Sequence, residues 1–266
     1  MKIIISPAKK MNLDTDSYDI RGVPEFKEDT RILMEKIRSL SFSEAKALWK
    51  CNDSLTRLNY ERFQSMNLEG ALTPAIMAYE GLQYQHLAPA VLTKEALSYV
   101  EDHLCILSGF YGLLKAFDGV TPYRLEMQAK LMVKGCKDLY DFWGDRLYKK
   151  LCDLNKKLPD GDSVIINLAS KEYSRCIENY ITDKERFVTV EFVQIIDGKK
   201  KQKGTLAKMA RGEMVRFMAE KGIVDPNEMK DFCWLGFAYS EELSEEKRYV
   251  FRKLEEDGEG IKSVDI

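Results

Sequence analysis

The sequence predicts an α+β protein folded as one domain spanning residues 1–266. Three observations support this. Short apolar, β-branched runs predict buried strands, apolar residues at helical spacing predict amphipathic helices, and Asp197-Gly198 is a strong two-residue hairpin signal. A regular alternation of strand and helix would not contain such a hairpin, which favours α+β over a doubly wound α/β fold. No repeat, low-complexity linker or proline cluster divides the chain.

Each expected element has a local reason. Ser41 and Glu44 form a capping-box pattern that predicts the start of a short helix, and Gly222 predicts the end of a long one. Asp29 and Thr93 are expected N-caps. The expected strands are 2–5, 74–79, 104–107, 163–168, 186–196, 199–206, 232–238 and 248–254, with 122–127 extended; the expected helices are 29–40, one after 41, 53–66, 93–103, 138–158 and 206–221.

Composition excludes several classes of function. The net charge is only −2, so any nucleic-acid binding must come from a local basic patch. Six cysteines include no C-x-x-C pair and only two histidines occur, which argues against a zinc ribbon, a Ser-His-Asp triad or a metal centre. No run approaches the roughly 20 apolar residues of a membrane span. We therefore expect a cytoplasmic protein with no cofactor and no resident metal.

Positive charge is concentrated in residues 199–221, which hold eight basic and two acidic side chains. On a helical wheel, Lys208, Arg211 and Gly212 lie opposite the apolar side chains of the same helix. This pattern predicts a surface that contacts phosphates, and a solvated lysine-rich turn is the alternative. Gly212 costs the helix about 1 kcal/mol relative to alanine, which suggests close approach of a backbone or ligand.

Two glycines follow an apolar run in Ser108-Gly109-Phe110-Tyr111-Gly112. The spacing predicts a tight turn leading into a helix, whose backbone N–H groups would face a phosphate. The turn is faintly similar to the helix-hairpin-helix element of DNA-repair proteins, although it lacks the usual G-x-G spacing. A purely structural turn remains the alternative.

Two polar clusters complete the candidates. Arg124 and Glu126 would share one face of an extended segment, where they would either form a buried ion pair or bind a polar ligand. Residues 167–173 place Ser170 and Glu172 after a buried strand. Strand ends are common ligand sites, but Ser170 would equally serve as an ordinary helix cap.

Taken together, the chain resembles the YaaA family of peroxide stress proteins. The resemblance is carried by six motifs in the family's order: Ser6-Pro7-Ala8-Lys9; Leu107-Ser108-Gly109 with Tyr111-Gly112; residues 122–127; Asp138-Leu139-Tyr140 with Phe142-Trp143-Gly144; residues 167–173; and Lys208 with Ala210-Arg211-Gly212, Met214 and Arg216. The chain departs from the family pattern at Met209, where a lysine is usual, and at Ala116, where a proline is usual.

The resemblance implies a compact mixed fold peculiar to the family, with a helix-hairpin-helix-like element. It further implies a positively charged cleft that binds duplex DNA with little sequence preference and protects against peroxide and iron damage. No stable protein partner is inferred. The expected DNA contacts are Lys9, Ser108, Gly109, Tyr111, Gly112, Arg124, Lys208, Arg211, Gly212 and Arg216.

Two other functions stay open. One is an enzyme acting on a nucleobase, nucleotide or DNA lesion, with a lyase or glycosylase-like activity. In that case Lys9 would be a Schiff-base amine if burial favoured its neutral form, with Glu126 or Glu172 as general acid or base. The other is a regulatory protein that affects iron indirectly, since clustered metal ligands are missing from the sequence.

Overall fold

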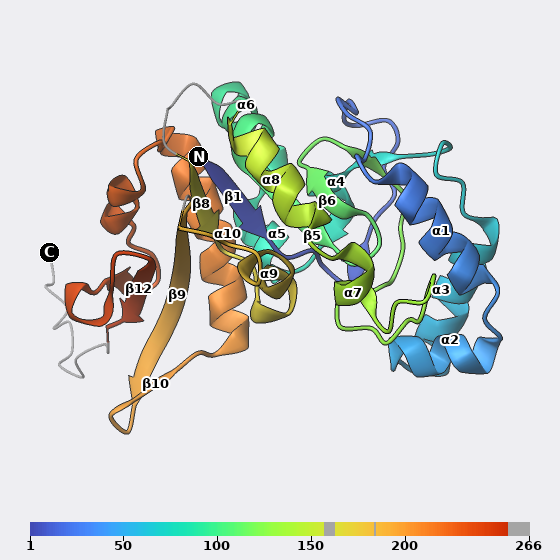
Figure 1. Ribbon diagram of the computed structural model, residues 1–266. Helices are drawn as coiled ribbons and strands as arrows, with labels where there is room; N and C mark the ends of the chain where they lie inside the picture. Colours follow the sequence, from blue (N-terminus) through green and yellow to red (C-terminus); the bar gives the residue numbers. More distant parts are fainter. Residues whose placement is uncertain (157–162, 184, 255–266) are drawn as a thin grey trace, which may run out of the picture.

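A computed structural model describes residues 1–156, 163–183 and 185–254 (Figure 1). Within these ranges one eight-stranded sheet forms the centre of the fold, in the order β11-β12-β9-β8-β1-β5-β6 with β10 paired to β9. Its strands are β1 (Lys2–Ile5), β5 (Leu104–Ser108), β6 (Gly112–Lys115), β8 (Val164–Asn167), β9 (Arg186–Ile196), β10 (Lys199–Lys201), β11 (Phe237–Tyr239) and β12 (Arg248–Lys253). The five strands from β12 to β5 run parallel, and β6, β10 and β11 are antiparallel to their neighbours.

Helices cover both faces of this sheet. The α-helices are α1 (Lys27–Arg38), α2 (Phe42–Trp49), α3 (Asp53–Ser65), α4 (Ala75–Ala78), α5 (Leu82–Leu87), α6 (Lys94–His103), α7 (Leu139–Trp143), α8 (Arg146–Lys156), α9 (Lys171–Glu178) and α10 (Gly204–Lys221). Figure 1 shows α8 and α9 in front of the sheet and α10 behind it; α10 packs on α5 and α6. The remaining elements are the pairs β2 (Lys10–Met11) with β4 (Tyr79–Glu80) and β3 (Thr73–Pro74) with β7 (Gly119–Val120), and the 3₁₀ helices Pro89–Val91, Pro226–Asp231 and Glu241–Leu243.

The central strands are buried because their residues are apolar on both faces, as a sheet between two helical layers requires. Ile3, Ile4 and Ile5 of β1 are completely buried, and Ile4 pairs with Cys105 of β5 and Asn167 of β8. The predicted strands 104–107 and 163–168 are confirmed as β5 and β8, the two neighbours of β1. The α+β class is also confirmed. The Asp197-Gly198 hairpin is also confirmed, since β10 returns antiparallel to β9.

The chain changes direction across the sheet at β1. It leaves β1 for β5 on one side, and returns later to β8 on the other side before continuing to β9 and β12. Parallel sheets bind ligands in the crevice outside the carboxyl ends of the strands at such a reversal of strand order. A ligand site is therefore expected in the crevice between the ends of β1 and β8.

Several predicted elements are wrong in detail. Residues 75–78, predicted as part of a strand, form the short helix α4. The predicted helix 138–158 is two helices, because Gly144 adopts a positive φ of 51° between α7 and α8; its last two residues lie outside the described ranges. The helix α1 begins before Asp29 and is not capped by it. Of the predicted strand 232–238, only the last two residues lie in the sheet, where they begin β11 (Phe237–Tyr239).

Gly212 lets two helices touch through their backbones. A Cβ atom on Gly212 would lie 2.1 Å from the carbonyl oxygen of Gln83 and 2.9 Å from the amide nitrogen of Leu87, both in α5. The close approach suggested by the sequence is therefore that of the α5 backbone. This contact fixes α10 against α5 and sets the position of its neighbour Arg211.

We expect Gly212→Ala to destabilise the protein by roughly 3 kcal/mol, because backbone atoms of α5 must move to admit the methyl group. This loss outweighs the gain of about 1 kcal/mol in helix propensity. Gly204→Ala in the first turn of the same helix is the matched control, since no atom lies within 4 Å of its added Cβ. Urea unfolding measures both; equal effects of the two substitutions would contradict the packing argument.

Candidate functional site

A cavity of about 570 Å³ lies at the carboxyl ends of β1 and β8. Its walls come from residues 6–10 after β1, residues 80–84 around the start of α5, residues 170–173 at the start of α9, and one face of α10. Its charged lining residues are Lys9, Lys10, Glu80, Glu172, Lys208 and Arg211. Segments some 200 residues apart in the sequence thus meet at the point where the strand order reverses.

Two serines join the strand ends at the floor of this cavity. The Ser6 hydroxyl donates a hydrogen bond to the Ser170 hydroxyl at 3.1 Å and accepts one from the Ser170 amide at 2.8 Å. Ser170 is the N-cap residue of α9, but its side chain makes no capping hydrogen bond. The backbone N–H groups of Lys171 and Glu172 consequently have no partner among the described residues, and a helix amino end of this kind favours an anion.

Arg211 is the half-buried cation of the cavity, and it also lines a neighbouring pocket that contains Glu191. Within the described residues its guanidinium makes no hydrogen bond or ion pair, and its Nε atom is buried without a partner. Burial lowers the pKa of Arg211 to about 10, against the favourable charge of Glu191. Lys208, one turn earlier on α10, is exposed and has no ion pair in the described structure.

The other two lysines are paired with acids. Lys9 lies 2.9 Å from a carboxylate oxygen of Glu126, and Arg124 contacts the same oxygen at 3.1 Å. Arg124 and Glu126 therefore share a face as predicted, and they form an ion pair. Lys10 pairs with Glu80, which also accepts a hydrogen bond from Asn12. The Lys9 side chain is 65% exposed, so the burial that would favour a neutral amine is not present.

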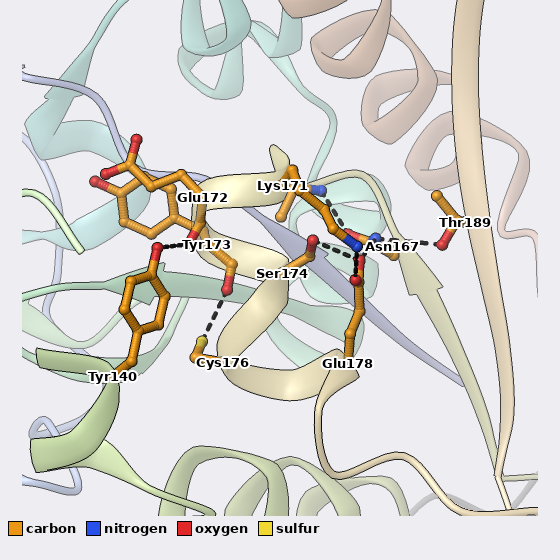
Figure 2. A network of polar contacts seen from close by, with 10 residues as sticks. Tyr140, Asn167, Lys171, Glu172, Tyr173, Ser174, Cys176, Glu178 and Thr189 are labelled. Carbon is orange, nitrogen blue, oxygen red and sulfur yellow. Dashed lines mark hydrogen bonds and ion pairs between the residues drawn. The ribbon is translucent and has the colours of Figure 1, made fainter. Parts of the chain in front are cut away.

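Glu172 is the acid of the cavity that forms no ion pair within the described residues. Burial raises the pKa of Glu172, the backbone N–H of Gln128 lowers it, and the charge of Glu126 raises it further. The Gln128 amide donates to the carboxylate at 3.3 Å. Figure 2 shows the side chains of Glu172 and Tyr173 on one side of α9 and the polar network of Glu178 on the other.

The polar network around Glu178 includes Lys171. Glu178 accepts hydrogen bonds from Ser174 at 2.6 Å and from Asn167 at 3.3 Å, and it pairs with Lys171 (Figure 2). Asn167 also donates to Thr189 of β9 at 3.4 Å. These contacts tie α9 to the sheet, and the charge of Lys171 is used within the protein.

Comparison of the sequence with known proteins identifies the family. Residues 1–243 match the family model described as "Peroxide stress protein YaaA". The chain is 52% identical over 255 residues to a UPF0246 protein of Lachnoclostridium phytofermentans, covering 96% of this chain and 97% of that protein. It is 50% identical to a UPF0246 protein of Desulfitobacterium hafniense (95% and 98% covered) and 48% identical to one of Agathobacter rectalis (95% and 99% covered).

The chain belongs to the YaaA family of peroxide stress proteins. The names of these relatives state no ligand and no activity.

The helix-hairpin-helix-like element that the YaaA resemblance implied is not found at the glycine turn. Gly112 begins β6, which pairs antiparallel with β5, so no helix follows the turn. The turn is buried throughout, and the Ser108 hydroxyl accepts the N–H groups of Phe110 and Tyr111 at 3.1 and 2.9 Å. A Cβ on Gly109 would lie 2.6 Å from the carbonyl oxygen of Leu125. The turn supports residues 122–127 from within the core.

Of the expected DNA contacts, the structure brings Lys9, Lys208 and Arg211 to one cavity. Four others lie in the core: Ser108, Gly109, Tyr111 and Gly112. Gly212 packs on α5. Arg216 pairs with Glu220 at 2.8 Å and is not among the residues that line the cavity. Sequence reasoning missed Ser6, Glu80, Gln83 and Tyr84. For Ser6 a signal was available, since it directly follows a buried strand; the other three lie in and beside α5, which was not predicted.

Two absences hold for residues 1–156, 163–183 and 185–254. No three side chains of His, Cys, Asp or Glu are grouped closely enough to hold a metal ion. None of the helices in these ranges combines the length and apolar character needed to span a bilayer.

We expect Glu172→Gln to stabilise the protein relative to wild type increasingly as pH rises. Burial raises the folded-state pKa of Glu172 above its ordinary value of 4.5. The wild type therefore carries a penalty for the buried charge that is absent at lower pH and grows as the carboxyl ionises. Glutamine keeps an acceptor for the Gln128 amide. Urea midpoints of both proteins from pH 4 to 7.5 test this, and a pH-independent difference would contradict it.

Proposed function

We propose that the protein contributes to peroxide resistance by binding duplex DNA, largely without sequence preference. The observation that supports this most is the convergence of Lys9, Lys208 and Arg211 on one cavity at the strand ends. Two of these three cations have no ion pair in the described structure, and the third, Lys9, is well exposed. Cations arranged in this way suit the phosphates of a nucleic acid.

The lysines of the β9–β10 hairpin extend this basic surface. Lys199, Lys200 and Lys201 form β10 and are exposed, and Lys203 is the N-cap residue of α10. Figure 1 shows the hairpin projecting from the sheet and leading directly into α10, which carries Lys208 and Arg211. A hairpin and a helix of this kind can follow a phosphate backbone, whereas base reading needs amide and guanidinium groups on a recognition helix.

The protective role follows from the family and from this binding. Ferrous iron and peroxide generate damage close to the DNA on which iron is bound, so a protein that covers the phosphates excludes iron from them. We propose this role in the cytoplasm, and any effect on iron levels as an indirect one.

The double variant Lys9→Ala, Lys208→Ala should bind a duplex roughly 10- to 50-fold more weakly at 0.1 M salt, because two phosphate contacts and their released counterions are lost. The slope of log affinity against log salt should fall by about one per lysine. Fluorescence anisotropy with two unrelated 20-base-pair duplexes measures both quantities, and both duplexes should respond alike.

Lys221→Ala is the matched control for this experiment. Lys221 is exposed on the same helix, about 20 Å from Lys208 at 1.5 Å per residue. If Lys221→Ala and the double variant weaken binding equally, the cavity is not the DNA site. Affinity that does not change with salt would argue against phosphate binding altogether.

A second candidate function is lyase-type processing of a damaged nucleotide, favoured by the position of Glu172 in the same cavity as Lys9. An amine would add to the aldehyde of an abasic site and lose water to form an imine, and a carboxyl group of raised pKa suits the proton transfers.

This candidate predicts that borohydride reduces the imine to a stable covalent adduct between the protein and abasic DNA. The adduct should disappear in Lys9→Ala and persist in Lys10→Ala, the neighbouring lysine of the same cavity. Denaturing gel electrophoresis detects it. Absence of any adduct with the wild-type protein eliminates the imine mechanism and leaves DNA binding unaffected.

A further inference from the structure

We propose that the cavity at the ends of β1 and β8 is a specific site for a terminal phosphate monoester carried by a nucleoside-sized group, with Arg211 as its principal phosphate ligand. The inference rests on the proposed function and deepens it. The same chemistry is offered by a free nucleoside monophosphate and by the phosphorylated end of a DNA strand.

Arg211 forms no ion pair within the described residues, although Glu172 and Glu80 line the same cavity. The charge of Glu191 favours the Arg211 cation without forming an ion pair with it. A half-buried cation without an ion pair costs free energy, and proteins ordinarily pair such groups. A planar guanidinium held in this way is suited to bidentate binding of a phosphate that enters the cavity.

Several hydrogen-bond donors in or beside the cavity have no acceptor within the described residues. The Ser170 hydroxyl accepts from Ser6, so its own proton remains available. The N–H groups of Lys171 and Glu172 are uncapped at the amino end of α9. Gln83, only 6% exposed, lines the cavity, and its side-chain nitrogen is buried without a hydrogen-bond partner. Charge and backbone donors together form an anion site of the kind found at helix starts.

The charge of the cavity lining also fits a phosphate monoester. Four cationic and two acidic side chains line the cavity, a net of two positive charges. A phosphate monoester carries a charge of about −1.5 to −2 at neutral pH, whereas each phosphodiester of an intact strand carries one negative charge. The cavity therefore matches a chain end or a free monophosphate better than an internal linkage.

The cavity is large enough for a nucleotide, and Arg211 is less exposed than its lysines. Lys208 is exposed and Lys9 is 65% exposed, so an intact duplex reaches them from outside, whereas the half-buried Arg211 requires a group that enters. A volume of about 570 Å³ is within the range of small-molecule sites and larger than a phosphate needs. The buried side chains of Tyr84 and Tyr173 form part of its lining.

Isothermal titration of the full chain with deoxyadenosine monophosphate, deoxyadenosine and inorganic phosphate tests the proposal. We expect saturable binding of the monophosphate, at least about tenfold tighter than that of the nucleoside, because charged hydrogen bonds to phosphate are gained. Arg211→Gln should lose about tenfold or more, and Arg211→Lys should recover part of it. Arg57→Gln, an exposed arginine of α3, is the control and should bind as wild type.

Circular dichroism establishes that each variant is folded. Lys208→Ala, whose side chain is exposed, is the second variant and should weaken binding of the monophosphate without disturbing the fold. The proposal is overturned if wild-type protein does not distinguish the monophosphate from the nucleoside and also binds phosphorylated and hydroxyl DNA ends equally. It is also overturned if folded Arg211→Gln binds the monophosphate as wild type does.

Nicked duplexes with a 5′-phosphate or a 5′-hydroxyl at the nick distinguish the two sources. Tighter binding of the phosphorylated nick, reversed by free monophosphate, supports a strand end as the ligand. Equal binding of both nicks together with specific monophosphate binding supports a free nucleotide. The salt series on intact, hydroxyl-ended duplex is run in parallel. Normal duplex binding without phosphate specificity refutes this inference alone, and phosphate specificity without duplex binding refutes the proposed function alone.

Discussion

The backbone contact between α5 and α10 at Gly212 is the constraint on which the site depends. With no side chain at this position, the carbonyl of Gln83 and the amide of Leu87 come within contact distance of the α10 backbone. Arg211 is thereby held beside the start of α5 and over the ends of β1 and β8. A wider helix separation would leave Arg211 free to turn toward solvent, where it would be one more surface cation and would no longer face a cavity.

Around that fixed point the protein neutralises most of its charges in pairs and leaves a few uncompensated. Glu126 forms ion pairs with Lys9 and Arg124. Glu80 forms one with Lys10, and Glu178 forms one with Lys171. The uncompensated cations, Lys208 and Arg211, lie on one helix three residues apart. A net charge of −2 for the whole chain conceals this local excess, because electrostatic recognition depends on which charges remain unpaired and not on their sum.

The sequence predicted those features that depend on local composition. The buried strands β1, β5 and β8 are short apolar runs, the capping box at Ser41 and the Gly222 stop of α10 are short motifs, and all are confirmed. Glu172, Lys208 and Arg211 were identified as candidates from local patterns, and Lys9 from the resemblance to the YaaA family. The helix α4, the break at Gly144 and the β-hairpin at Gly112 were not predicted, since apolar runs fit helix and strand alike and glycines fit several turns. Tertiary packing decided each case.

The position of the cavity could not be predicted because it follows from strand order, which local patterns do not contain. Ser6 and Ser170 are unremarkable in the sequence, and they become neighbours only because β1 and β8 are adjacent and parallel. The same arrangement brings the uncapped amino end of α9 and Arg211 of α10 to the lining of one cavity. A fold that leaves a cation and several N–H groups unsatisfied together loses stability at that place, and a bound anion would restore it. This coupling between stability and ligand is the physical reason to regard the cavity as a binding site and not as a gap in the packing.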